Sequence, residues 1–208
     1  GTNILKIHGV DSLNPVEVTT IPDMIEAGTF LMAGATLGNI TLNNVNPTHL
    51  SIVMQKLEQA GCRIHVDGNS ISIEKCDRLE AVDMTTDVYP GFPTDLQAQW
   101  IALMSVAKGS SIITDTIYHD RFSHVPELVR LGANISLENN VVVVRGVEKL
   151  KGAQVMSTDI RASASLVIAA LMAEGRTDIS RIYHIDRGYE RIEKKFQSLG
   201  ADICRETE

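Results

Sequence analysis

Five charged residues stand where the sequence predicts that helices begin, and their types suit the binding of an anion. They are Asp95, Arg121, Asp159, Arg161 and Arg187. The free N–H groups and the dipole of a helix N-terminus favour anions, and arginine adds planar paired donors for a phosphate or a carboxylate. These residues therefore predict an anion site, provided that the fold brings the helix starts to one rim.

A plainer interpretation of the same residues stays open. An aspartate near a helix start is usually a cap, which is the role expected of Asp23. Arg121 and Arg187 have acidic neighbours in Asp120 and Asp186, and exposed ion pairs of that kind contribute little. Two histidines, His119 and His184, recur with the repeated pattern and are therefore expected to be structural.

The elements that must position these residues recur three times, with a period of about seventy residues, which is typical of one supersecondary unit copied along the chain. The triplets Ala60-Gly61-Cys62, Leu131-Gly132-Ala133 and Leu199-Gly200-Ala201 each follow a helix-like run and precede a strand-like run. Approximate boundaries of the copies are 14–79, 80–150 and 151–208.

Each copy has the pattern of a strand, an apolar helix, a second strand, an amphipathic helix and a hairpin. The opening strands are expected at 16–20, 82–86 and 155–158, and the apolar helices at 23–38, 94–109 and 159–175. Because those helices lack a polar stripe, we expect each to be buried on every side. The fold class is therefore predicted to be α/β (α+β), with three βαβαββ-type units that place helices inside and sheet outside.

The two ends of the chain each carry a strand-like run without a neighbour. Residues 202–206 follow the last helix with no partner strand behind them, and residues 3–9 have none before them. An unpaired strand edge is an aggregation liability. We therefore predict that these ends pair, so that residues 3–13 close one domain spanning 1–208.

Composition and charge exclude several classes of function. The net charge of −7 makes binding to nucleic acid or to an anionic membrane by bulk electrostatics unfavourable. No apolar run approaches the roughly 18 residues of a membrane span. With no leader-like start, a cytoplasmic protein is expected. The cysteines Cys62, Cys76 and Cys204 show no metal-ligand spacing, so neither a metal nor another cofactor is predicted.

Four long stretches resemble the enolpyruvyl transferases, and in particular those that act on UDP-N-acetylglucosamine. They are PGFPTDLQAQ (90–99), DRFSHVPELVRLGA (120–133), VEKLKGAQVMSTDIRASASLVIAA (147–170) and RIYHIDRGYERIEKKFQSLGADI (181–203). The resemblance implies an inside-out α/β barrel. It also implies transfer of the enolpyruvyl group of phosphoenolpyruvate to the sugar 3-hydroxyl, with release of phosphate, in peptidoglycan precursor synthesis.

The same resemblance implies roles for the charged residues. Asp95 is similar to the carboxylate that contacts the 3-hydroxyl and accepts its proton, and Arg161 and Arg187 are similar to the groups that hold phosphoenolpyruvate. Asp159 and Arg121 match further active-site charges, with Asp159 counted among the catalytic residues and Arg121 among the substrate-binding ones. Ile117 matches a position that lines the nucleotide-sugar site.

The chain departs from the family in its extent, because it resembles only the C-terminal half. The resemblance implies that the N-terminal domain supplies a mobile loop with a reactive cysteine and further substrate contacts, and that the strands finishing this domain come from the far N-terminus. Three functions stay open: an inactive half of the enzyme, a non-catalytic module that binds an anion or a nucleotide sugar, and an enzyme assembled from two copies of this chain.

Overall fold

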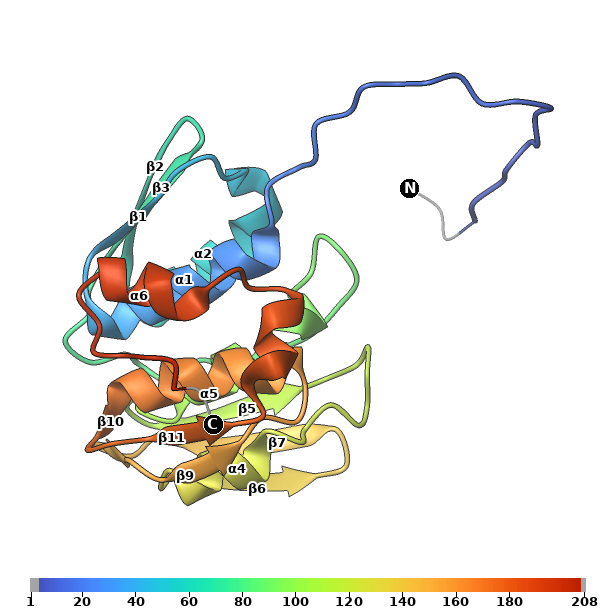
Figure 1. The fold of residues 1–208 in the computed structure, drawn as a ribbon. Coiled ribbons are helices and arrows are strands. Elements are labelled where there is room, and N and C mark those ends of the chain that lie inside the picture. Colours follow the sequence, from blue (N-terminus) through green and yellow to red (C-terminus); the bar gives the residue numbers. More distant parts are fainter. Residues whose placement is uncertain (1–3, 207–208) are drawn as a thin grey trace.

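The computed structural model describes residues 4–206, and the second of the predicted copies is the most complete in it (Figure 1). Its elements, in chain order, are β4 (Met84–Thr85), the 3-10 turn η2 (Thr94–Leu96), α3 (Gln97–Met104), β5 (Ser110–Thr114), α4 (Val125–Arg130), β6 (Asn134–Glu138) and β7 (Val141–Arg145). The sheet order is β4-β5-β7-β6, with β4 parallel to β5 and the other neighbours antiparallel. The predicted order of elements is thus confirmed for this copy.

The first copy repeats this topology without the opening strand. Its elements are α1 (Met24–Leu37), β1 (Ile40–Leu42), η1 (Pro47–Leu50), α2 (Ser51–Gln59), β2 (Arg63–Asp67) and β3 (Ser70–Glu74). The sheet order β1-β3-β2 matches β5-β7-β6 of the second copy. Both hairpins turn through a residue with positive φ, at Gly68 and Asn139, as the Asp-Gly and Asn-Asn pairs predict.

The third copy has the parallel strand pair and the helices but not the hairpin. Its elements are β8 (Leu150–Lys151), β9 (Gln154–Met156), α5 (Ile160–Met172), β10 (Ala173–Glu174), β11 (Asp178–Ser180), η3 (Ile182–Arg187) and α6 (Ile192–Ser198). Strand β9 pairs in parallel with β11, and β8 with β10. Within the described residues, 201–206 form no strand.

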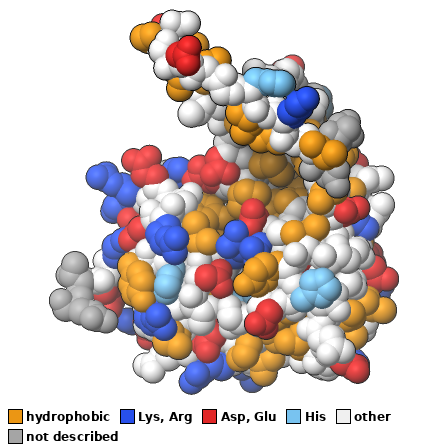
Figure 2. Space-filling view, turned by 90° about the vertical axis from the view of Figure 1, so that its right-hand side faces the viewer, with side chains coloured by type: hydrophobic (Ala, Val, Ile, Leu, Met, Phe, Trp, Pro, Cys, Tyr) orange, Lys and Arg blue, Asp and Glu red, His pale blue; other side chains and the backbone are white. Residues whose placement is uncertain are grey.

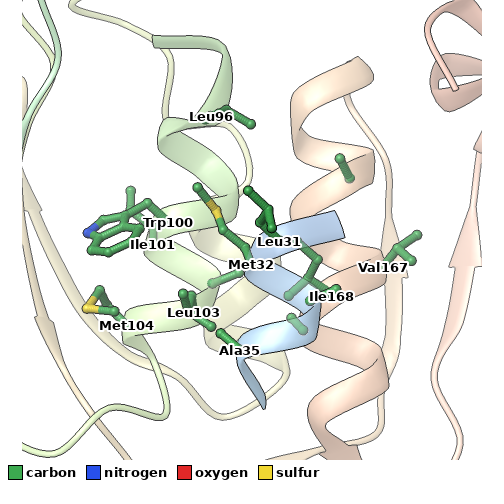
Figure 3. Packing of buried hydrophobic residues seen from close by; sticks show 14 of the residues in the cluster. Leu31, Met32, Ala35, Leu96, Trp100, Ile101, Leu103, Met104, Val167 and Ile168 are labelled. Atoms are coloured by element: carbon green, nitrogen blue, oxygen red, sulfur yellow. The ribbon is translucent and has the colours of Figure 1, made fainter. Parts of the chain in front are cut away.

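Helices α1, α3 and α5 pack against one another and form the core (Figure 3). Leu31 and Met32 of α1, Leu103 of α3 and Ile168 of α5 are fully buried where the three helices meet. Each copy contributes one of these helices, and the sheets of the copies lie around them. The prediction that these apolar helices are buried on every side is confirmed.

Close packing within the second copy leaves no room for a side chain at Gly146. A methyl group built there would lie 1.6 Å from the carbonyl oxygen of Ala107, a backbone atom that cannot turn aside. We expect Gly146→Ala to lower the free energy of unfolding by about 3 kcal/mol or more, because overpacking displaces the backbone. Urea unfolding measures the loss. Gly38→Ala, where no atom lies within 4 Å, is the control and is expected to change little.

The predicted closure of the domain by its two ends is wrong. Residues 4–22 belong to no strand, and 201–206 do not pair with them. Asn3, which belongs to the predicted strand, lies outside the described residues, as do 1–2 and 207–208. The reason lies at 16–20: the equivalent segments in the other copies, β4 and β9, pair with β5 and β11, but 16–20 does not pair with β1. The arm of residues 4–22 extends away from the body (Figure 1).

The arm of residues 4–22 exposes many apolar side chains. Those more than two-thirds exposed are Ile4, Leu5, Ile7, Val10, Leu13, Val16, Val18 and Ile21. A stretch this rich in exposed aliphatic side chains is typical of a segment that packs against another part of a protein.

Candidate functional site

Asp95, Arg121 and Arg161 come together at one end of the helical core. Arg121 Nη1 donates to Asp95 Oδ1 at 3.0 Å, and Arg161 Nε donates to the same oxygen. Asp95 lies in η2 at the entrance to α3, and Arg161 is the second residue of α5. Two cations on one carboxylate leave an excess of positive charge here, which is the chemistry that an anion site needs.

This contact decides between the interpretations open for Arg121 and Asp186. Arg121 pairs with Asp95, within the second copy, rather than with its neighbour Asp120, and it also lies 4.8 Å from the ring centroid of Tyr118. Asp186 pairs with Arg205, at 2.9 and 2.6 Å, rather than with Arg187. Neither arginine therefore forms the ion pair with its sequence neighbour that the plainer interpretation allowed, although Arg121 does pair with another acid, Asp95.

Arg187 is exposed and has no ion pair among the described residues. It ends η3, and the next residue, Gly188, packs so closely on Ile160 at the start of α5 that a Cβ would lie 2.3 Å from Ile160 Cδ1. The backbone at Arg187 therefore lies beside the same helix start that carries Arg161. Among Arg121, Arg161 and Arg187, only Arg187 has no ion pair within the described residues.

Asp159 caps α5 and lies half-buried beside these charges. Its Oδ1 accepts the backbone N–H groups of Arg161 and Ala162 at 2.8 and 3.0 Å, and its Oδ2 accepts the Ser123 hydroxyl at 3.0 Å. Burial raises the pKa of Asp159, but the hydrogen bonds from Ala162, Arg161 and Ser123 outweigh it, so the pKa lies below its ordinary value of 3.8. The cap role and the site role are thus compatible for this residue.

Replacing Asp159 tests the cap. Asp159→Ala is expected to lower the free energy of unfolding by about 1 kcal/mol at pH 7, because two backbone donors lose their acceptor. A lowered pKa stabilises the folded state above the ordinary value of 3.8 and loses that effect as pH falls through the folded-state pKa, so the difference from wild type shrinks in acid. Urea unfolding between pH 7 and pH values below 3.8 measures it. Asp159→Asn, which keeps an acceptor, is the matched control; equal losses in both variants contradict the cap.

Asp115 is a further residue of this region, which the sequence interpretation missed. The residue is fully buried. Its Oδ1 accepts hydrogen bonds from the Thr86 hydroxyl and from the backbone N–H groups of Ile117 and Tyr118, and its Oδ2 accepts one from the Thr94 hydroxyl, at 2.6 to 3.0 Å. The signal in the sequence is an aspartate directly after strand β5, SSIIT. Ile117, predicted to line a ligand site, is held on this turn and is 43% exposed.

The rim itself lies on an open face. It is carried by the loops after β4 and β5, by the start of α5 and by η3, on the right-hand side of Figure 1. Figure 2 looks onto that side and shows acidic and basic side chains mixed on it, below the arm. A hollow of about 350 Å³ beside β1 and a groove of about 1250 Å³ along β9 and β11 are lined by neither Asp95, Arg121 nor Arg161.

Two further features are absent from the described part of the chain, a metal-binding cluster and a membrane-spanning helix. Residues 4–206 contain no cluster of three or more His, Cys, Asp or Glu side chains arranged to hold a metal ion. Among the helices of that same range, none combines the length and the apolar character needed to cross a bilayer.

The sequence matches a family model described as EPSP synthase (3-phosphoshikimate 1-carboxyvinyltransferase) over residues 1–196. Relatives named UDP-N-acetylglucosamine 1-carboxyvinyltransferase are 55% identical in Chlorobium luteolum and 54% identical in Myxococcus xanthus. Each alignment covers 99% of this chain and 49% of the relative. The chain therefore spans about half the length of the curated relatives that it matches.

Solved structures agree with the sequence relatives. The enolpyruvyl transferase NikO from Streptomyces tendae superposes with a TM-score of 0.83 at 30% identity, covering 92% of this chain and 46% of that one. EPSP synthase from Acinetobacter baumannii gives a TM-score of 0.69 at 19% identity, over 90% of this chain and 45% of that one, which supports the likeness of the fold alone.

Proposed function

The chain belongs to the EPSP synthase (3-phosphoshikimate 1-carboxyvinyltransferase) family, and on that premise we propose that it is the C-terminal domain of a UDP-N-acetylglucosamine 1-carboxyvinyltransferase. Such an enzyme transfers the enolpyruvyl group of phosphoenolpyruvate to the sugar 3-hydroxyl and releases phosphate, in cytoplasmic peptidoglycan precursor synthesis. The observation that carries the proposal is the cluster of Asp95 with Arg121 and Arg161, in a chain 55% identical to relatives of that name.

The roles that we propose for the rim residues are those that the resemblance implies, and their contacts support them. Arg161 and Arg187 hold the phosphate and carboxylate of phosphoenolpyruvate, with Arg187 exposed and without an ion pair among the described residues. Asp95 accepts the proton of the 3-hydroxyl as that oxygen bonds to C2 of phosphoenolpyruvate, while C3 gains a proton. Loss of a proton from C3 and of phosphate from C2 then restores the double bond. Asp159 and Arg121 hold these groups in place, and Ile117 borders the nucleotide sugar.

The half-length of the chain shapes the rest of the proposal. An N-terminal half, present in relatives of twice this length, would cover the open rim and supply the remaining substrate contacts. Closure of a second domain over a site excludes water and orients the reacting groups. We propose that this half also supplies strands that complete an inside-out barrel with helices inside, and that it covers the apolar arm of residues 4–22.

Complementation of the chain tests this function. Phosphate release from phosphoenolpyruvate and UDP-N-acetylglucosamine is measured for the chain alone and after adding the N-terminal half of the Chlorobium luteolum relative. We expect turnover in the mixture and none above background with either half alone. Turnover by the chain alone that rises with the square of its concentration supports instead an enzyme made of two copies. Binding of UDP-N-acetylglucosamine without turnover in any mixture supports a non-catalytic module.

A further inference from the structure

Asp115 forms no hydrogen bond with Asp95, Arg121 or Arg161, but it hydrogen-bonds to Thr94 and Tyr118, two residues that contact Arg121. Its Oδ2 accepts the Thr94 hydroxyl at 2.6 Å, and its Oδ1 accepts the backbone N–H of Tyr118 at 2.9 Å. Arg121 Nη1 donates to that same Thr94 hydroxyl at 3.0 Å, and its guanidinium lies over the Tyr118 ring. The carboxylate therefore fixes the hydroxyl and the ring between which Arg121 sits.

The direction of the bond between Thr94 and Asp115 decides what Thr94 offers to Arg121. A hydroxyl has one proton to donate and lone pairs with which to accept. Because an ionised carboxylate only accepts, Thr94 must give its proton to Asp115, which leaves its lone pairs for Arg121 Nη1. The arginine is then aimed at Asp95 Oδ1, which its Nη1 also contacts at 3.0 Å.

The carboxylate is suited to stay ionised in this position. Burial raises the pKa of Asp115, but hydrogen bonds from Thr94, Tyr118, Thr86 and Ile117 outweigh burial and hold the pKa below its ordinary value. Four donors converge on one buried side chain, so the acceptor is used nearly to capacity.

We propose that Asp115 is a positioning residue, which orients the Thr94 hydroxyl and through it directs Arg121 onto Asp95. The expected effect of Asp115 on phosphoenolpyruvate binding rests on the proposed function, whereas its effect on the position of Arg121 does not. Asparagine is the informative replacement because it has almost the same shape. With Thr86, Ile117 and Tyr118 still served by the amide oxygen, the amide nitrogen faces Thr94 as a donor. Thr94 must then accept from it, so the carboxylate no longer holds the hydroxyl proton away from Arg121 and the amide competes for the lone pairs of Thr94.

The side-chain NMR signals of Arg121 test the positioning directly in the 208-residue chain. Rotation of the guanidinium group is slow while Nη1 is bonded to Thr94 and Asp95, and Asp115→Asn is expected to accelerate it about 10-fold, the effect of losing one hydrogen bond to a charged group. Asp83→Asn is the matched control, because Asp83 also accepts a backbone N–H, from Ile112 at 2.7 Å, on a strand away from Thr94. An unchanged rotation rate in folded Asp115→Asn overturns the proposal.

A second pair of variants keeps the test decisive if Asp115→Asn does not fold. Thr94→Val removes the hydroxyl and is expected to free Arg121 to the same extent, whereas Thr94→Ser keeps the hydroxyl and the slow rotation. Unchanged rotation in Thr94→Val overturns the proposal. Calorimetry with phosphoenolpyruvate then links it to function: we expect Asp115→Asn to weaken binding about 10-fold. Failure of the wild-type chain to bind phosphoenolpyruvate counts against the proposed function, and the Arg121 signals still decide the positioning.

Discussion

Asp95→Asn is expected to lower kcat for enolpyruvyl transfer by about 10²- to 10⁴-fold, the range that a positioned proton acceptor contributes. The measurement is phosphate release by this chain complemented with the N-terminal half. An amide oxygen does not take the proton of the 3-hydroxyl. In addition, the amide nitrogen would be a donor beside two other donors, Arg121 and Arg161, which share Asp95 Oδ1 in the present structure.

The control for this variant is a nearby carboxylate outside the cluster. Asp120→Asn removes an exposed charge one residue before Arg121, and we expect it to leave kcat within about 2-fold of wild type, because exposed charges without close partners contribute little. If Asp95→Asn and Asp120→Asn reduce kcat equally, general electrostatics rather than proton acceptance at Asp95 explains the loss.

Local signals predicted most elements of the fold because the same pattern recurs in each copy, and the second copy carries all of them. Asp23 and Asp159 accept the first backbone N–H groups of α1 and α5, as aspartates at those positions are expected to do. The seventy-residue repeat and the Asp-Gly and Asn-Asn turn residues predicted the positions of both hairpins. The predicted closure depended on residues 3–9 pairing with 202–206, and among the described residues neither 4–9 nor 202–206 forms a strand. No local signal in either run tells whether its partner strand lies within this chain.

The sequence predicted which residues belong to the candidate site better than it predicted which of them contact one another. The threefold repeat indicated that helix starts share a rim, and Asp95, Arg121 and Arg161 do meet there. Their pairing was missed because the nearest acid in sequence, Asp120, is not the nearest in space. Asp115 was missed for a different reason: a polar residue after a strand is ordinarily exposed, and only the tertiary structure shows that this one is buried with its oxygens saturated.

Arg187→Ala is expected to reduce kcat/KM for phosphoenolpyruvate by about 10²- to 10³-fold in the complemented enzyme, the effect of removing one preorganised donor from a developing anion. The structural reason is that the guanidinium groups on the rim differ in whether they already form an ion pair. Arg121 and Arg161 are engaged with Asp95 and must share their donors with it, whereas Arg187 is exposed and has no ion pair within the described residues. An incoming phosphate therefore meets its first unshared cation at Arg187.

Arg187→Lys separates charge from geometry at the same position. Lysine keeps the positive charge but has no planar fork for two parallel hydrogen bonds to an oxyanion. If Arg187 acts by bidentate binding, the lysine variant recovers less than about one-tenth of the lost kcat/KM, since charge-assisted paired bonds are the stronger ones. Full recovery by lysine would show that Arg187 acts as a point charge. No loss in either variant would remove Arg187 from the site and leave anion binding to the two arginines that Asp95 already engages.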